Sequence, residues 1–204
     1  MNYNVIYEQF KDLKTENKVI ISNVIVNAIQ PLITLKHDKC LINLYNYYLN
    51  KLFENKTDKK ELYREYKIRV EKCFELKEYD NSSYSSYEDT NFFVYLSFAA
   101  TEVLGIALYS SKVSFGNMLI SYIIEISEIL DDYYYFKNKG KIETDGLEGL
   151  LKNISQRIIQ NSCEKLLMNS IKICMNSDIR DKKDELEKEI EDYKNNLTKI
   201  LSIH

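Results

Sequence analysis

Two apolar segments joined by a short break, within residues 87–136, dominate the pattern of hydrophobic and polar positions along the chain. Residues 92–109 are apolar on nearly every side of a helix, which is typical of a helix buried on most sides. Residues 118–130 are almost as apolar, and they lead into a run of acidic and tyrosine side chains. We therefore expect a central helical hairpin with an acidic, aromatic rim at the end of its second helix.

Amphipathic helices are predicted on the N-terminal side of this hairpin. Apolar residues recur three and four apart in four segments, residues 4–13, 15–30, 39–53 and 58–77. Pro31 ends or kinks the second of these helices, because proline lacks an amide donor and clashes with the preceding turn. Residues 79–88 are rich in Asp, Asn, Ser and Tyr and lose the helical period, so they are predicted to form the longest loop.

The chain after the hairpin is predicted to form a basic turn and two more helices. The turn is expected at residues 137–140, which read Lys-Asn-Lys-Gly. A long helix should then run from about residue 147 to residue 175. Residues 178–202 carry a narrow apolar stripe, which is typical of an outer amphipathic helix or of a coiled-coil seam.

Composition favours the all-α class. The chain has 204 residues, of which 45% are hydrophobic, with only five glycines and one proline. Long helices with short connections suit so few helix breakers. We predict a single all-α domain over residues 1–204, a bundle of about seven or eight helices around the central hairpin.

Cysteine usage indicates a reducing compartment. The chain contains Cys40, Cys73, Cys163 and Cys174, which lie far apart in the sequence and form no CxxC pair. Zinc sites need close pairs of such ligands, so no metal site is expected from them. We interpret them as reduced cysteines, most of them in the core, of a protein in a reducing cytosol.

No membrane span is expected. A helix that crosses a bilayer needs about 20 consecutive apolar residues. Residues 92–109 come closest, but Ser97, Thr101 and Glu102 interrupt them, and the first residues of the chain are too polar for a signal peptide. The sequence therefore predicts a soluble cytoplasmic protein.

Candidate chemistry is sparse, which favours a function other than catalysis. His37 and His204 are the only histidines, so the chain has few residues from which to build a histidine general base or a histidine metal site. Glu125 and Glu128 could supply carboxylates to a metal in a helical bundle, but the di-iron pattern needs Glu-x-x-His pairs, and none is present. Glycine-rich phosphate-binding motifs are also missing. We predict no catalytic residues, no metal and no cofactor.

The charge is distributed unevenly. The formal net charge of −3 disfavours a general nucleic-acid binder, because such proteins carry a basic surface for phosphates. Residues 81–136 contain seven acidic side chains and one basic residue, Lys112. Burying an unpaired carboxylate is very costly. We therefore expect these acids either to reach solvent at the helix ends or to meet Lys or Arg of neighbouring helices.

Tyrosines are interleaved with these acids at both ends of the predicted hairpin. Antiparallel packing would place the start of its first helix beside the end of its second helix and form one acidic, Tyr-rich patch. Tyrosine is enriched in protein interfaces, and complementary charge selects the partner. Alternatively, most of the 17 tyrosines pack at the edges of the core and reflect only a biased composition. The candidate partner-binding residues are Tyr84, Tyr87, Glu88, Asp89, Glu128, Asp131, Asp132, Tyr133, Tyr134 and Tyr135.

The order of segments resembles the YjaG-like family of uncharacterised bacterial helical proteins. The likeness rests on the amphipathic helix that ends at Pro31, a helix pair with a charged second member, the acidic Tyr-containing loop and the Ala-rich helix at residues 95–104. The sequence departs from that family in having no proline beside the Ala-rich helix and more residues before the last two helices. The resemblance implies a single all-helical domain and assigns no catalytic residue.

These patterns predict a non-enzymatic helical protein-binding module. The preferred hypothesis is an immunity or antitoxin-type protein, whose acidic, Tyr-rich patch neutralises a basic toxin such as a nuclease. A first alternative is a metal-dependent enzyme that uses the carboxylates of the hairpin. A second is a homodimeric structural scaffold, joined through the apolar stripe between Leu186 and Leu201.

Overall fold

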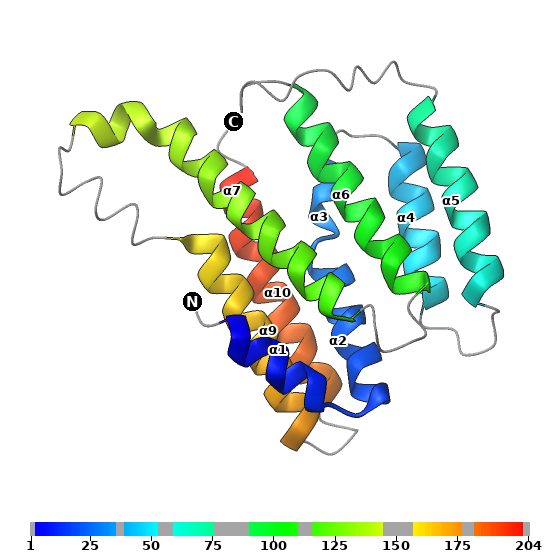
Figure 1. Cartoon of the computed structure of the whole chain (residues 1–204). Coiled ribbons are helices and arrows are strands. Elements are labelled where there is room, and N and C mark those ends of the chain that lie inside the picture. Colours follow the sequence, from blue (N-terminus) through cyan, green and yellow to red (C-terminus); the bar gives the residue numbers. More distant parts are fainter. Residues whose placement is uncertain are drawn as a thin grey trace.

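The structure is a computed structural model, and it describes residues 3–35, 39–52, 59–75, 90–109, 116–144, 157–176 and 182–201. Every secondary-structure element in these residues is a helix, so the prediction of an all-α bundle is confirmed (Figure 1). In chain order the helices are α1 (Tyr3–Asp12), α2 (Thr15–Ala28), α3 (Pro31–Thr34), α4 (Lys39–Leu52), α5 (Lys59–Glu75), α6 (Thr90–Tyr109), α7 (Gly116–Thr144), α9 (Ile158–Asn176) and α10 (Lys182–Leu201).

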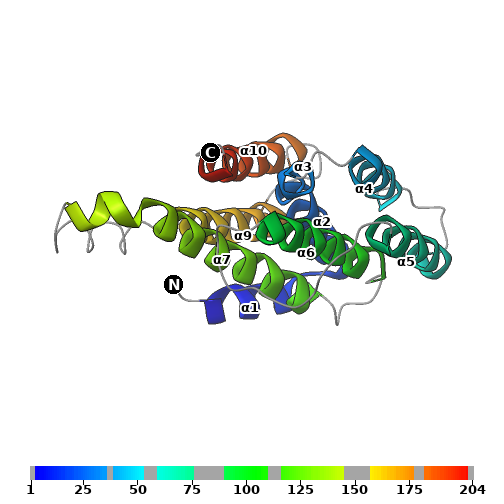
Figure 2. The same ribbon diagram turned by 90° about the horizontal axis from the view of Figure 1, so that it is seen from above.

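Helices α2 and α6 share the centre of the bundle. Helix α6 packs against α2, α3, α4, α5 and α7, whereas α2 packs against α4, α6, α7, α9 and α10. Helices α4 and α5 therefore lie on one side of this pair, and α1, α7, α9 and α10 lie on the other (Figures 1 and 2). The sequence predicted α2 as one of the amphipathic helices around the hairpin. Instead the consecutive residues Val24, Ile25 and Val26 are all buried, as in a helix covered on most sides.

The break between α2 and α3 occurs at Pro31, as predicted. Proline occupies the first position of α3, where its missing amide hydrogen has no helical partner to lose. Backbone carbonyls on both sides of the break accept hydrogen bonds from other helices. The Tyr45 hydroxyl of α4 donates to the Val26 carbonyl over 2.9 Å, and the Ser97 hydroxyl of α6 donates to the Leu32 carbonyl over 2.8 Å. These buried bonds fix the break against both neighbouring helices.

The two helices of the hairpin are antiparallel neighbours where they meet. The ring of Phe92, at the start of α6, stacks on the ring of Tyr133 in α7 with centroids 4.8 Å apart. Phe93 packs edge-on against the same ring at 5.7 Å. The start of α6 therefore lies beside the later part of α7, which is the arrangement that the sequence analysis expected.

Helix α7 is longer than predicted. It continues through residues 137–140 to Thr144, so the prediction of a basic turn at this point is wrong. Lysine is a good helix former, and one glycine inside a helix costs only about 1 kcal/mol relative to alanine. The last turns of α7 extend beyond the neighbouring helices (Figures 1 and 2).

Helix α10 is the outer helix that its narrow stripe predicted. Its apolar side chains pack mainly against α9 and also against α2. The buried members of the stripe are Leu186, Tyr193, Leu197, Ile200 and Leu201. This stripe is therefore covered within the chain, where the scaffold alternative would have left it for a second copy. The predicted first part of the preceding helix, residues 147–156, lies outside the described residues.

Candidate functional site

The described candidate residues all lie on one helix. Glu128, Asp131, Asp132, Tyr133, Tyr134 and Tyr135 belong to α7. The other four, Tyr84, Tyr87, Glu88 and Asp89, lie outside the described residues. The structure therefore addresses the part of the predicted patch that α7 carries.

Three carboxylates line the outer side of α7. Glu125, Glu128 and Asp132 are exposed, and their spacing of three and four residues puts them on one face of the helix. At 1.5 Å per residue they span about 10 Å along the helix axis. None of the three forms an ion pair with another residue in the part of the chain that the structure describes. We call Glu125, Glu128 and Asp132 the anionic stripe.

Asp131, one residue before Asp132, faces into the fold. It is 8% exposed, and its two carboxylate oxygens accept hydrogen bonds from the backbone amides of Ile159 and Gln160, each over 2.9 Å. These are the second and third residues of α9, whose amides have no partner within the helix. The residue before α9 is Arg157, which has no side-chain acceptor. Asp131 therefore caps α9 from a different helix, as an N-terminal Asp or Ser does locally.

Burial and helix capping shift the pKa of Asp131 in opposite directions. Burial raises the pKa of its carboxyl above the ordinary value of 3.8, while the two amides and the Arg157 guanidinium work to lower it. From the sequence, such an acid was expected either in solvent or beside a basic neighbour. Asp131 has a third kind of partner, the free amides at the start of another helix. Sequence alone gives no signal for this contact, because Asp131 and Ile159 are 28 positions apart.

The tyrosines of the rim also differ in burial. Tyr133 is buried, 2% exposed, in its stack with Phe92, so it holds the hairpin together. Tyr134 and Tyr135 are half-buried and keep part of their surface in solvent. The structure thus leaves Glu128, Asp132, Tyr134 and Tyr135 of the predicted patch at the surface and places Asp131 and Tyr133 inside.

A buried polar cluster lies under α7, between α9 and α10. The Ser127 hydroxyl donates to the Ile123 carbonyl over 2.7 Å, so the Tyr193 hydroxyl, 3.1 Å away, donates to Ser127. Cys163 lies in the same cluster, and burial raises the pKa of its thiol to about 12. A thiol with so high a pKa is protonated at neutral pH and is a poor nucleophile. The cluster therefore joins three helices and does not resemble a catalytic site.

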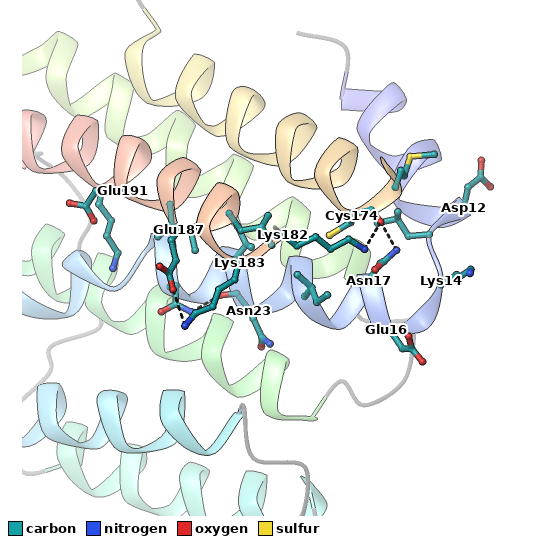
Figure 3. Close-up of a pocket in the computed structure, with 18 residues that line it drawn as sticks. Asp12, Lys14, Glu16, Asn17, Asn23, Cys174, Lys182, Lys183, Glu187 and Glu191 are labelled. Atoms are coloured by element: carbon teal, nitrogen blue, oxygen red, sulfur yellow. Dashed lines mark hydrogen bonds and ion pairs between the residues drawn. The ribbon is translucent and has the colours of Figure 1, made fainter. Parts of the chain in front are cut away.

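A groove of about 1080 Å³ opens between α2 and α10 (Figure 3). Its floor is apolar, with Leu13, Val24 and Leu186 buried and Ile20 and Ile190 half-buried. Its rim alternates in charge. The basic and acidic residues of the rim are Lys14, Lys182, Lys183 and Lys194, and Asp12, Glu16, Glu187 and Glu191.

Several polar groups of the groove serve the fold. The Asn17 side-chain amide and the Lys182 ammonium both donate to the Cys174 carbonyl, over 2.9 and 3.2 Å, and satisfy the end of α9 (Figure 3). Lys194 donates to the Gln30 side-chain oxygen over 3.0 Å, and burial lowers the pKa of its ammonium. Because both signs of charge balance around the rim, the groove presents no single sign of charge to a partner.

Two more features of the described residues bear on function. Within the described ranges, no group of three or more His, Cys, Asp or Glu side chains is arranged to hold a metal ion. Phe92–Tyr109 is long and apolar enough to cross a membrane by length and composition, and 67% of this window is buried inside the fold. The core helix of a soluble protein has the same properties. Cytoplasmic location stays a prediction.

Comparisons of this chain with protein-family models, with curated proteins and with solved structures find no match. The resemblance to the YjaG-like family therefore stays a prediction.

Proposed function

We propose that this chain is a non-enzymatic helical protein-binding module that binds a basic protein through the anionic stripe of α7. The observation that carries the proposal is the row of three exposed carboxylates that form no ion pair in the described part of the chain. Charged groups of this kind gain more from a cationic partner than from other solvated side chains. Tyr135, three residues after Asp132 on the same face of α7, adds contact area with a polar tip.

The rest of the fold supports this role by holding α7 rigidly. The inner side of α7 is anchored to α6 through Tyr133, to α9 through Asp131 and to α10 through Ser127. A rigid surface loses little conformational entropy when it binds, so more of the interaction energy appears as affinity. Exposed charge on such a surface raises the association rate and makes it sensitive to salt.

An immunity or antitoxin-type protein fits this surface best. A toxin that acts on nucleic acid needs a cationic cleft for phosphates, and carboxylates spaced along one helix can occupy that cleft. Neutralisation then needs no catalytic group on the present chain. A toxin gene beside the gene for this protein would agree with the proposal.

Charge reversal of the stripe tests the proposal. The variant carries Glu125→Lys, Glu128→Lys and Asp132→Lys and leaves Asp131 in place, because Asp131 caps α9. Tagged wild type and variant serve as baits in lysate of the native cell at low and high salt, with bound proteins quantified by mass spectrometry. We expect the wild type to capture a basic protein, and we expect the variant to lose at least ten-fold of it at low salt.

A matched control separates the stripe from overall charge. Glu8→Lys, Glu71→Lys and Glu187→Lys reverse three other exposed acids on α1, α5 and α10, and both triple variants move the formal net charge from −3 to +3. The control should capture the same basic protein as the wild type. Equal loss in both variants, equal capture by the stripe variant, or capture of a protein with no basic surface would each contradict the proposal.

A further inference from the structure

Two cysteines that are distant in the sequence meet between α4 and α5. The sulfur atoms of Cys40 and Cys73 are 3.3 Å apart, although 33 positions separate them in the chain. Cys40 is the second residue of α4, and Cys73 is the third residue from the end of α5. The two antiparallel helices therefore bring the start of one beside the end of the other. The sequence alone did not predict this pair.

The two sulfur atoms are close to bonding distance. A disulfide bond is about 2.05 Å long, so they would need to approach by roughly 1.2 Å. Small changes in side-chain torsion supply a movement of this size. Farther along the same pair of helices, the rings of Tyr48 and Tyr66 pack edge-on with centroids 5.0 Å apart. This contact holds α4 and α5 in register while the sulfurs move.

Access differs sharply among the four cysteines. Cys40 is exposed, and Cys73, whose sulfur is 3.3 Å from that of Cys40, is 9% exposed. Cys163 and Cys174 are 0% and 2% exposed, and burial raises the pKa of both of their thiols. Thiol–disulfide exchange requires a thiolate that the reagent can reach. Reaction should therefore begin at Cys40 and leave Cys163 and Cys174 as thiols.

We infer that Cys40 and Cys73 form a redox-active dithiol, which low-molecular-weight disulfides of the glutathione class oxidise to a disulfide. The Cys40 thiolate attacks one sulfur of the reagent, forms a mixed disulfide and releases one thiolate. The Cys73 thiolate then attacks the Cys40 sulfur, forms the Cys40–Cys73 bond and releases the second thiolate. The two protein thiols lose two electrons and two protons, and the reagent is reduced to two thiols.

This modification ties α4 to α5 on the side of the bundle away from the anionic stripe. The bond closes a loop that contains most of both helices, and such a cross-link stabilises the chain mainly by restricting the unfolded state. Helices α4 and α5 lie across α2 and α6 from α7 (Figures 1 and 2). The inference is therefore independent of the proposed binding function.

Oxidation of the purified full chain with oxidised glutathione tests the inference. Samples are quenched with acid, alkylated and measured by intact mass and by peptide mapping without reductant. We expect the wild type to lose two hydrogens and to link the Cys40 peptide to the Cys73 peptide. The midpoint of thermal unfolding should rise by roughly 5–10 °C, and treatment with a thiol reductant should reverse the rise.

Two single variants report the separate steps. Cys73→Ser should stop at the mixed disulfide and accumulate one glutathione adduct on Cys40, and Cys40→Ser should remain unmodified. Cys163→Ala, if circular dichroism shows that it is folded, should behave as the wild type. Accumulation of the Cys40 adduct in the wild type, or linkage of any other cysteine pair in the folded chain, would overturn the inference.

Discussion

The inner and outer sides of α7 carry the same kinds of side chain for opposite purposes. On the inner side, Asp131 binds the first amides of α9 and Tyr133 stacks on Phe92. On the outer side, the adjacent Asp132 is exposed, and Tyr135, three residues farther along the same face, is half-buried. A step of one residue turns a side chain by about 100° around a helix. The role of a side chain on α7 therefore depends more on its position around the helix axis than on its residue type.

Substitutions on the two sides of α7 should also affect different properties. Groups on the inner side have lost their water and depend on their partners in the fold, so removing one leaves its partner unsatisfied. Groups on the outer side remain solvated, and replacing them has little effect on the fold. The inner side should therefore respond to mutation through unfolding, and the outer side through partner capture.

The largest expected effect is at Asp131. Asp131→Ala should lower the free energy of unfolding by about 3 kcal/mol, because two amides at the start of α9 lose charged acceptors in a buried place. Asp132→Ala should change it by less than about 0.5 kcal/mol, since Asp132 is exposed. Urea denaturation followed by circular dichroism measures both values. Equal effects of the two substitutions would show that α7 has no such division.

The sequence predicted the helical class and much of the chain path because both depend on local patterns. Apolar periodicity located α4, α5, α6 and α10, and Pro31 marked the start of α3, because proline acts on its own neighbours. The predicted turn at residues 137–140 was wrong, because one glycine is too weak a signal to stop a long helix.

The site was less predictable because it depends on contacts between distant segments. The sequence predicted Asp131 and Asp132 together in one acidic rim. In the structure Asp131 binds the start of α9, whereas Asp132 is exposed. The approach of Cys40 to Cys73 likewise depends on how α4 and α5 pair. Composition predicted an acidic, tyrosine-containing helix end, but it could not say which side chains face a neighbour and which face solvent.

A pair of tyrosines gives a smaller test of the same division. Tyr193→Phe removes the buried hydroxyl that donates to Ser127, and it should cost about 1 kcal/mol of unfolding free energy. Tyr7→Phe removes the bond between the Tyr7 hydroxyl and the exposed Ser121, 2.8 Å apart, and should cost only a few tenths of a kcal/mol. Urea titrations of both variants beside the wild type provide the measurement. A larger loss at Tyr7 would reverse the proposed roles of the two sides.

The pH dependence of Asp131 should be the smallest effect, and its sign is informative. Because burial raises its pKa above 3.8, the folded chain holds this proton more tightly than the unfolded chain does. The stability linked to this bound proton, which is separate from that of the two hydrogen bonds, is fully present below about pH 3.8 and is lost as the pH rises through the folded pKa. The difference in unfolding free energy between wild type and Asp131→Asn, measured in urea, should therefore shift in favour of the wild type as the pH falls from 7 to 4. A shift toward the variant would mean that the amides of Ile159 and Gln160 outweigh burial and lower this pKa.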